Sequence, residues 1–256
     1  MSYLNTVPLV WGFEHSPALR DTFELSYALP SVCADRIARG EADIGILPVI
    51  EMARQGLEYF RGTGIACHGP VRTITLVSKV PYREIRTLAA DAGSRTSVML
   101  ARVVLAERFG AAPRVFPHAA DLARMLDAAD AALIIGDAAL QLDPETLPFA
   151  SLDLGAEWVD MTGLPMVFAV WSGRRELIQE RYERAFRESC RFGLDHIADI
   201  ARRQPAERGV SEALARRYLT ENIVFELGEK DYEGMRLYLE HALRLDRVTV
   251  PGGVAV

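Results

Sequence analysis

Residues 31–48 read SVCADRIARGEADIGILP and place a helix directly before a buried strand. Ser31 can accept a hydrogen bond at the start of the helix, and Gly40 supplies its C-terminal stop. The apolar run 44–47 is typical of a buried strand, and it ends at Pro48. A helix and a strand in so short a unit favour an α/β fold.

The same alternation continues along the chain. A second unit places a helix, then Ala129-Asp130, before the apolar run 131–135, and its likeness to the first unit is what two similar lobes would produce. Beyond 44–47, the sequence predicts strands over residues 25–29, 65–67, 73–78, 88–90, 115–116, 131–135 and 167–172. It predicts further helices over residues 94–109, 120–128, 176–203, 211–223 and 229–245.

Size and charge limit the class of protein. The chain has 256 residues, half of them hydrophobic, which suffices for one large domain or two small ones. A net charge of −6 argues against nucleic acid as the main partner, because phosphate binding needs a basic face. There is no transmembrane run and no secretory signal, so we expect a cytoplasmic protein without a membrane partner.

Metal and cofactor motifs are missing from the sequence. The three cysteines form no CxxC pair, and the five histidines have no metal-ligand spacing. There is no Walker loop, no GxSxG and no GxGxxG after a strand. We therefore assign no metal and no cofactor.

Two polar segments could bind an anion at the start of a helix. Residues 94–97, Ser-Arg-Thr-Ser, bring hydroxyls, free backbone N–H groups and the positive end of a helix dipole into one turn. Arg95 could add a charged hydrogen bond, although Ser94 could equally be a plain N-cap. Residues 2–9, Ser-Tyr-Leu-Asn-Thr-Val-Pro-Leu, form what we call the N-terminal segment, a polar loop leading into a helix. Taken alone, this segment is more typical of an ordinary cap.

Three further turns could bring backbone close to a ligand. They are Gly69-Pro70-Val71-Arg72 between two strands, Gly136-Asp137 after a buried strand, and Thr162-Gly163-Leu164-Pro165 before a strand. Locally, each is also explained by an ordinary turn or helix cap.

Taken together, these segments resemble the chorismate dehydratase family of the futalosine route to menaquinone. The resemblance covers essentially the whole chain and rests on residues 2–9, 69–72, 94–98, 135–140 and 162–171. It implies a two-lobed α/β fold like that of the type II periplasmic binding proteins, with the ligand cleft between the lobes. Lobe one would comprise residues 1–76 and 168–256, and lobe two residues 77–167, with strands 73–78 and 167–172 crossing between them.

The resemblance also implies an activity. The family removes water from chorismate, a small dicarboxylate, and leaves 3-[(1-carboxyvinyl)oxy]benzoate, with no metal or redox cofactor. We expect Asn5 to be catalytic, as a donor of the oxyanion type. The resemblance is compatible with transfer of the proton to the enolpyruvyl carboxylate of the substrate, and Asp137 is the alternative base among the matched motifs. We expect substrate binding by Gly69, Pro70, Val71, Ser94, Thr96, Ser97, Gly136, Asp137, Gly163 and Pro165.

One departure and two alternatives stay open. Family members usually carry a short apolar strand before the N-terminal segment, whereas here Ser2 follows Met1 directly. Either the start of the sequence is misassigned or truncated, or the strand is absent, in which case the sheet of lobe one would lose a central strand and the loop that carries Asn5 would be loosened. The alternative functions are a 1,4-dihydroxy-6-naphthoate synthase of the same pathway and a non-catalytic solute-binding protein.

Overall fold

The strands of the computed structural model form two separate sheets. The model describes residues 3–91, 93–204 and 208–248, so Ser2 lies outside it. The first sheet has the order β1-β8-β2-β9, and all its neighbouring strands are antiparallel. Its strands are β1 (Ile44–Pro48), β2 (Glu58–Cys67), β8 (Met166–Gly173) and β9 (Val224–Glu226).

The second sheet has five strands in the order β5-β4-β6-β3-β7. The three strands β5, β4 and β6 run parallel, and β3 lies antiparallel to both β6 and β7. Its strands are β3 (Ile74–Ser78), β4 (Thr87–Ala90), β5 (Arg114–Pro117), β6 (Ala131–Ile135) and β7 (Ala150–Asp153).

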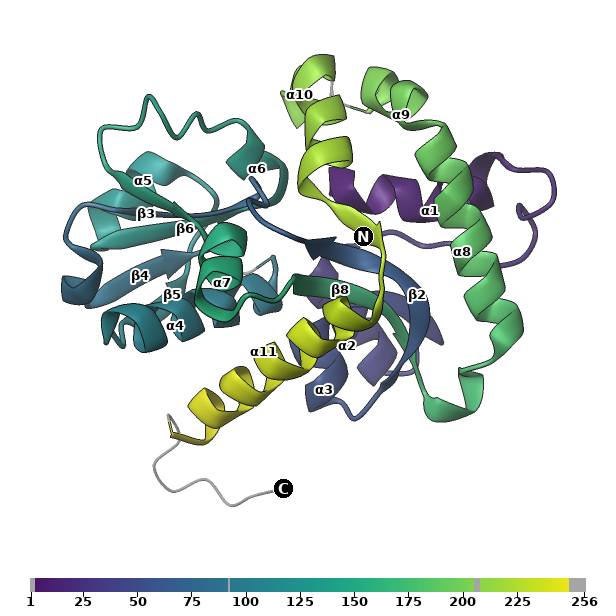
Figure 1. Cartoon of the computed structure of the whole chain (residues 1–256), viewed down its shortest axis with the longest axis horizontal. Coiled ribbons are helices and arrows are strands. Elements are labelled where there is room, and N and C mark those ends of the chain that lie inside the picture. Colours follow the sequence, from purple (N-terminus) through teal and green to yellow (C-terminus); the bar gives the residue numbers. More distant parts are fainter. Residues whose placement is uncertain (1–2, 92, 205–207, 249–256) are drawn as a thin grey trace.

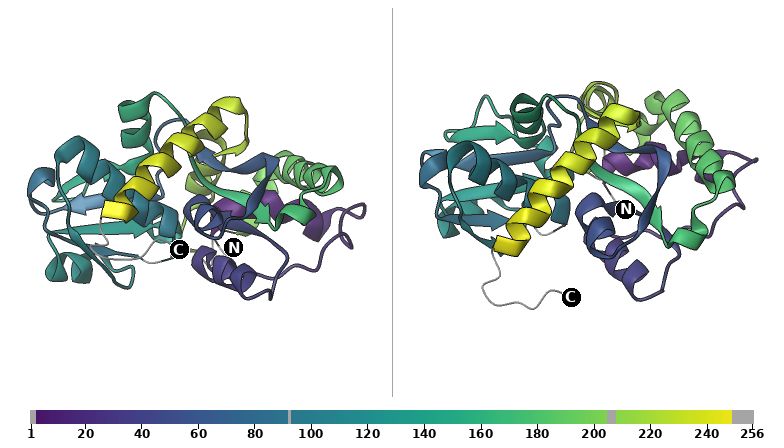
Figure 2. Two further views of the ribbon diagram at one scale, coloured as in Figure 1. Left: turned by 90° about the horizontal axis from the view of Figure 1, so that it is seen from below. Right: turned by 60° about the horizontal axis from the view of Figure 1, so that its bottom comes forward.

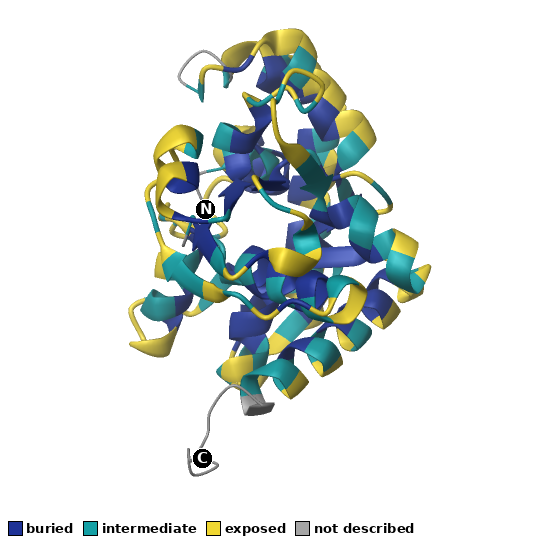
Figure 3. Ribbon diagram, turned by 90° about the vertical axis from the view of Figure 1, so that its left-hand side faces the viewer, coloured by how far each residue is buried: buried dark blue, intermediate teal, exposed yellow. Residues whose placement is uncertain are grey.

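Helices surround both sheets, and Figure 1 shows the two lobes side by side. The longest helix, α11 (Glu229–Val248), contacts β8 of the first sheet and α4 of the second lobe, and so runs along both lobes (Figure 2). The other helices are α1 (Val7–His15), α2 (Pro30–Ala38), α3 (Val49–Arg54), α4 (Arg95–Phe109), α5 (Leu122–Ala128), α6 (Gly136–Leu140), α7 (Leu154–Thr162), α8 (Glu180–Asp195), α9 (Ile197–Arg203) and α10 (Glu212–Arg217). Short helical turns are η1 (Leu4–Thr6), η2 (Tyr82–Glu84), η3 (Arg175–Leu177) and the π-helical η5 (Tyr218–Asn222). Figure 3 shows buried residues in the strands at the centre and exposed residues on the outer helix faces.

Strand β3 lies wholly within the second sheet, and β8 wholly within the first. The chain therefore passes outward between the sheets along residues 68–73, just before the stretch where we expected the crossing strand. The lobe limits at 76/77 and 167/168 stay a prediction.

The strand predicted over residues 25–29 is wrong, because this stretch is irregular. A strand requires a hydrogen-bonded neighbour, and no described strand pairs with these residues. Residues 25–27 line a groove of about 560 Å³ together with β1, Trp171 and Phe186. The indole Nε1 of Trp171 is buried there without a hydrogen-bond partner in the described structure.

One long predicted helix is divided into shorter elements in the structure. The helix predicted over 176–203 is three elements, η3, α8 and α9, because the chain leaves helical geometry at Ile178 and at His196. The sequence analysis also missed α7 and the short edge strands β7 and β9. Short edge strands carry too few residues for a clear alternating pattern.

The N-terminal segment is held by unusually close packing of α1 on α8. A Cβ atom on Gly193 would lie 2.0 Å from the carbonyl oxygen of Pro8, so only glycine permits this approach. Ser189 Oγ donates to the carbonyl of Leu9 at 2.9 Å and accepts from Phe13 N at 3.3 Å. The helix after the segment is therefore fixed to lobe one.

Asp130 ties together two parallel strands of the second sheet. Its Oδ2 accepts hydrogen bonds from Arg86 N at 3.0 Å, and from the N and Oγ1 of Thr87, each at 2.9 Å. The bond from Arg86 N, followed by the Thr87 bonds, holds the pKa of this carboxyl below its usual value. Its counterpart in the first unit, Asp43, is exposed and pairs with Arg174 at 3.3 Å.

We predict that Asp130→Ala lowers the free energy of unfolding by about 1–2 kcal/mol at pH 7. Because the ionised form accepts these bonds, their contribution is complete above the ordinary carboxyl pKa of about 4. It disappears as the pH falls through the lower pKa of the folded state. Urea denaturation across pH 7 to 3 measures this, with Asp43→Ala as the control that changes stability by less than about 0.5 kcal/mol. An equal effect of the two variants would contradict the prediction.

Candidate active site

A small cavity of about 40 Å³ lies where the two sheets meet. Its walls come from both lobes, with Ile65 and Phe168 on the strands of the first sheet and Ile74 and Ile135 on those of the second. Polar groups enter from the N-terminal segment, from the link between the sheets and from the start of α4. Those lining residues are Tyr3, Asn5, Thr73, Ser94 and Ser97.

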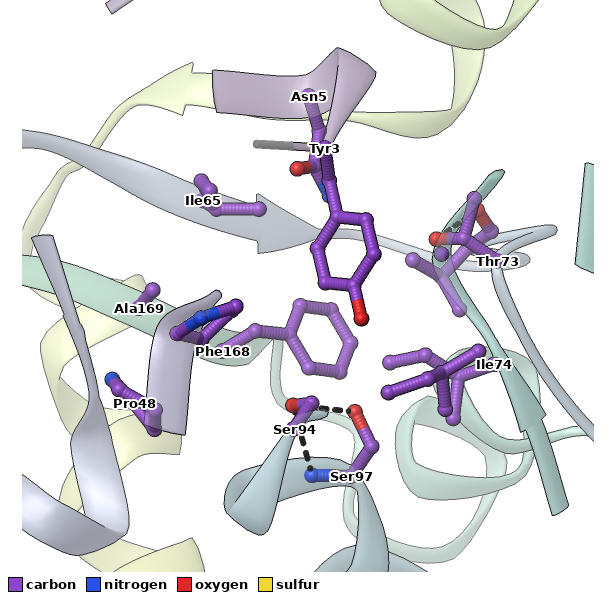
Figure 4. Close-up of a pocket in the computed structure, with 14 residues that line it drawn as sticks. Tyr3, Asn5, Pro48, Ile65, Thr73, Ile74, Ser94, Ser97, Phe168 and Ala169 are labelled. Atoms are coloured by element: carbon purple, nitrogen blue, oxygen red, sulfur yellow. Dashed lines mark hydrogen bonds between the residues drawn. The ribbon is translucent and has the colours of Figure 1, made fainter. Parts of the chain in front are cut away.

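Tyr3 projects its ring into this cleft, toward Ser94 and Ser97 (Figure 4). The ring packs so closely on Gly136 that a Cβ atom there would lie 2.6 Å from Tyr3 Cε1, and Gly136 has a positive φ of 63°. Burial, and then the charges of Asp91 and Asp137, raise the pKa of the Tyr3 phenol, so it stays neutral at physiological pH.

Asn5 lies on η1 and is held by a chain of hydrogen bonds. Its Nδ2 donates to Tyr218 Oη at 2.9 Å, and Tyr218 Oη lies 3.1 Å from Thr73 Oγ1. Thr73 Oγ1 donates in turn to the carbonyl of Val71 at 3.4 Å. The amide oxygen Oδ1 of Asn5 is buried and has no partner in the described structure. Asn5 therefore offers the cleft one hydrogen-bond acceptor, Oδ1, and one donor, the Nδ2 hydrogen that Tyr218 does not use.

The start of α4 supplies the second polar end of the cleft. Ser94 is its N-cap and accepts from Ser97 N at 3.4 Å, and the two hydroxyl oxygens lie 2.9 Å apart. Both residues line the cavity (Figure 4). Ser94 thus caps the helix and borders the cleft at once, so the two interpretations left open by the sequence are compatible.

Arg95, which the sequence offered as a charged hydrogen-bond donor to an anion, pairs with two carboxylates and is not among the residues that line the cavity. Its guanidinium pairs with Asp35 Oδ1 at 3.0 Å and with Glu51 Oε2 at 2.9 Å. Asp35 lies on α2 and Glu51 on α3, so this cluster joins lobe one to the helix that borders the cleft. Any anion bound here therefore depends on hydroxyls, backbone N–H groups and the helix dipole.

Asp137 is committed to the protein as well. Its Oδ1 accepts from the backbone N–H of Leu4 at 3.1 Å, and its Oδ2 pairs with Arg208. The N-terminal turn, for which we expected a loosened loop, is thus bonded through Leu4 to Asp137 and through Asn5 to Tyr218.

The structure brings together only part of the predicted set. Asn5, Val71, Ser94, Ser97 and Gly136 line the cavity, whereas the following do not: Gly69, Pro70, Thr96, Asp137, Gly163 and Pro165. Thr96 is buried, and its carbonyl accepts from Tyr238 Oη at 3.0 Å. Gly163 ends α7 in the left-handed conformation, and the carbonyl of Pro165 accepts from Trp158 Nε1 at 3.1 Å. The role of these residues in binding stays a prediction without support from the cavity.

The cleft is poor in ionisable groups. Among the described residues that line it, Tyr3 is the one with a titratable side chain, and no carboxylate, imidazole or amine borders the space. Within the described residues 3–91, 93–204 and 208–248, no group of three or more acidic, histidine or cysteine side chains could hold a metal ion. The helices in the described ranges include none that is apolar and long enough to span a membrane.

Sequence reasoning missed Thr73, Phe168 and Tyr218 as site residues. Thr73 directly follows the turn 69–72, and Phe168 lies within residues 162–171, one of the segments that carry the family resemblance, so each had a usable signal. Tyr218 lies 213 residues from Asn5 in the chain, and nothing in its local sequence indicates the contact.

Comparison with known proteins adds family and fold. A sequence model of the family described as Menaquinone biosynthesis matches residues 1–244. The chorismate dehydratase of Thermus thermophilus is 29% identical over 261 aligned positions, which cover 93% of this chain and 92% of that protein.

Two solved structures illustrate the fold. A protein from Archaeoglobus fulgidus superposes with a TM-score of 0.74 at 15% identity and covers 96% of each chain. The periplasmic aliphatic sulphonate binding protein SsuA from Escherichia coli gives a TM-score of 0.65 at 15% identity, covering 97% of this chain and 86% of that one. The expected two-lobed fold of the periplasmic-binding-protein type is thus confirmed.

We predict that Ser94→Ala combined with Ser97→Ala weakens the binding of benzoate at least 10-fold. Hydrogen bonds to a charged group contribute about 1.5–3 kcal/mol each, and the variant removes two such donors. Isothermal titration calorimetry measures the affinity. Ser211→Ala is the matched control, because Ser211 caps α10 in the same way, away from the cleft. Unchanged affinity in the folded double variant would exclude this helix start as the anion site.

Proposed function

The chain belongs to the menaquinone biosynthesis family, and on that premise we propose that it removes water from chorismate. The product is 3-[(1-carboxyvinyl)oxy]benzoate, an intermediate of the futalosine route, and the activity is that of a carbon–oxygen lyase. The observation that carries the proposal is the cleft itself. It offers one amide end and one helix-start end, separated by apolar walls, and no carboxylate, imidazole or amine is among the described residues that line it.

The reaction balances without any added reagent. A C–H bond of the ring and the neighbouring C–OH bond break, and a new ring double bond completes the aromatic system. The proton and the hydroxide leave together as water. Aromatisation supplies the driving force, so the protein needs to position the substrate and assist two departures.

The cleft suits a ring that carries two carboxylates. We propose that Ser94 and Ser97 bind one carboxylate at the positive end of α4. Phe168 and Ile74 lie beyond the hydroxyl end of the Tyr3 ring, to its left and right in Figure 4, and offer apolar walls for a flat ring. Asn5 would orient the reacting hydroxyl through Oδ1, an acceptor without a protein partner, and the Nδ2 hydrogen that Tyr218 does not use would be the donor expected for the departing hydroxide.

Removal of the ring proton needs a base, and the cleft wall supplies no obvious one. Asp137 uses one carboxylate oxygen on Leu4 N and pairs the other with Arg208. The neutral Tyr3 phenol is a poor base, because its pKa is raised. These observations support proton transfer to the enolpyruvyl carboxylate of the substrate itself. Water exclusion would strengthen that carboxylate as a base.

Substrate entry requires a change in the cleft. A cavity of about 40 Å³ is far smaller than the several hundred Å³ that ligand sites usually have. The Tyr3 ring fills the space between the amide and the helix start (Figure 4). We therefore propose that the lobes part or the Tyr3 ring turns out before chorismate binds.

The direct test incubates the purified protein with chorismate and follows the ultraviolet absorbance of an aromatic product, identified by mass spectrometry. Formation of 3-[(1-carboxyvinyl)oxy]benzoate supports the proposal. Turnover only of a cyclised futalosine derivative would assign the naphthoate-forming activity instead. Ligand binding without turnover of either compound would indicate a solute-binding protein.

We predict that Asn5→Ala lowers kcat about 100-fold, because removal of one positioned hydrogen-bonding group at a reacting centre costs about 10²–10³. Steady-state kinetics with chorismate measure the change. The matched control is Gln179→Ala, since Gln179 is exposed and its carboxamide donates to the carbonyl of Glu176 at 3.3 Å, away from the cleft. Near-normal turnover in folded Asn5→Ala would remove Asn5 from the mechanism.

A further inference from the structure

The hydroxyl of Tyr218 joins three segments that are far apart in the chain. Tyr218 is 1% exposed and lies on the π-helical turn η5. Its oxygen contacts Asn5 of the N-terminal segment at 2.9 Å and Thr73, between β2 and β3, at 3.1 Å. Such π-turns are rare in proteins and are frequent at functional sites.

The direction of these hydrogen bonds follows from the number of hydrogens available. Asn5 Nδ2 can only donate, so Tyr218 Oη accepts from it. The single Tyr218 hydrogen then points to Thr73 Oγ1, whose own hydrogen goes to the carbonyl of Val71. The chain of donors is complete and runs one way, from Asn5 to the backbone.

This chain fixes which end of the Asn5 amide enters the cleft. With Nδ2 turned to Tyr218, Oδ1 is buried at the cavity wall without a partner. A buried unpaired carbonyl is costly, so the position favours a ligand that brings a hydroxyl hydrogen. Without the Tyr218 hydroxyl, the amide could rotate and satisfy Oδ1 elsewhere.

We infer that Tyr218 is a positioning residue for the dehydration, holding the Asn5 amide so that Oδ1 meets the substrate hydroxyl. This inference rests on the proposed function. Tyr218 acts through Asn5 and is absent from the cavity wall, so it should affect the chemical step more than substrate binding. Burial raises the pKa of its phenol, so the hydroxyl remains a donor over the working pH range.

The first test is kinetic and uses Tyr218→Phe, which removes the hydroxyl and keeps the ring. We expect kcat to fall about 10–100-fold while KM changes less than threefold, because small misplacements of a catalytic group cost up to about 10². The variant Asn5→Ala with Tyr218→Phe should be no slower than Asn5→Ala alone. Independent, multiplied losses would overturn the inference, as would a wild-type kcat in folded Tyr218→Phe.

A matched control separates positioning from general stability. Tyr232 is likewise 1% exposed, and its Oη accepts from Gly62 N at 2.7 Å, away from the cleft. Tyr232→Phe should lose a comparable amount of thermal stability and keep its kcat. An equal fall in kcat for both variants would show that Tyr218 is merely structural.

A second readout does not need catalysis. The chain has two asparagines, Asn5 and Asn222, so protein with ¹⁵N-labelled asparagine gives two side-chain amide signals. Tyr218→Phe should shift and broaden the Asn5 signal and leave the Asn222 signal in place, whereas Tyr232→Phe should change neither. An unmoved Asn5 signal would refute the positioning role. Lack of chorismate turnover in the wild type would refute the proposed function alone.

Discussion

The geometry of the cleft depends on the carboxylate of Asp137, which joins the two lobes at the point where the reaction would occur. Its Oδ1 accepts the Leu4 N–H from the N-terminal turn, and its Oδ2 pairs with Arg208 from the chain before α10. The turn that carries Asn5 is therefore held in place by a hydrogen bond from its own backbone, at Leu4 N. Both of its oxygens have protein partners, and the contact of Asp137 with substrate stays a prediction.

The scarcity of ionisable groups in the cleft is as informative as the groups that are present. Arg95, the nearest cation to the start of α4 in the sequence, is held by Asp35 and Glu51. A carboxylate bound at Ser94 and Ser97 would thus be solvated by dipoles and hydroxyls rather than neutralised. Hydrogen bonds and the helix dipole favour the charged form of such a carboxylate, so in the proposed reaction the proton would go to the other carboxylate of the substrate.

The accuracy of the sequence predictions followed how local each signal was. The start and end of α4 were predicted correctly, because Ser94 and Gly110 act within one turn of the helix. Residues 25–29 have strand-like composition, yet they form no strand, because pairing depends on a neighbour elsewhere in the chain. The partners of Arg95 and Asn5 were equally out of reach, since ion pairs and buried hydrogen bonds join residues that only the fold brings together.

The fold raises the question of what distinguishes an enzyme from a binding protein of the same shape, such as the sulphonate binding protein it resembles. A helix start that holds a carboxylate binds substrate and transition state about equally, and so contributes affinity rather than rate. Asn5 differs, because its free Oδ1 and its fixed Nδ2 lie at the opposite end from that helix. The amide can change its interaction with the hydroxyl as the C–O bond breaks, whereas the helix start cannot. If the proposed function holds, the capacity for catalysis would therefore be concentrated in the N-terminal turn, which Tyr218 and Asp137 hold in place.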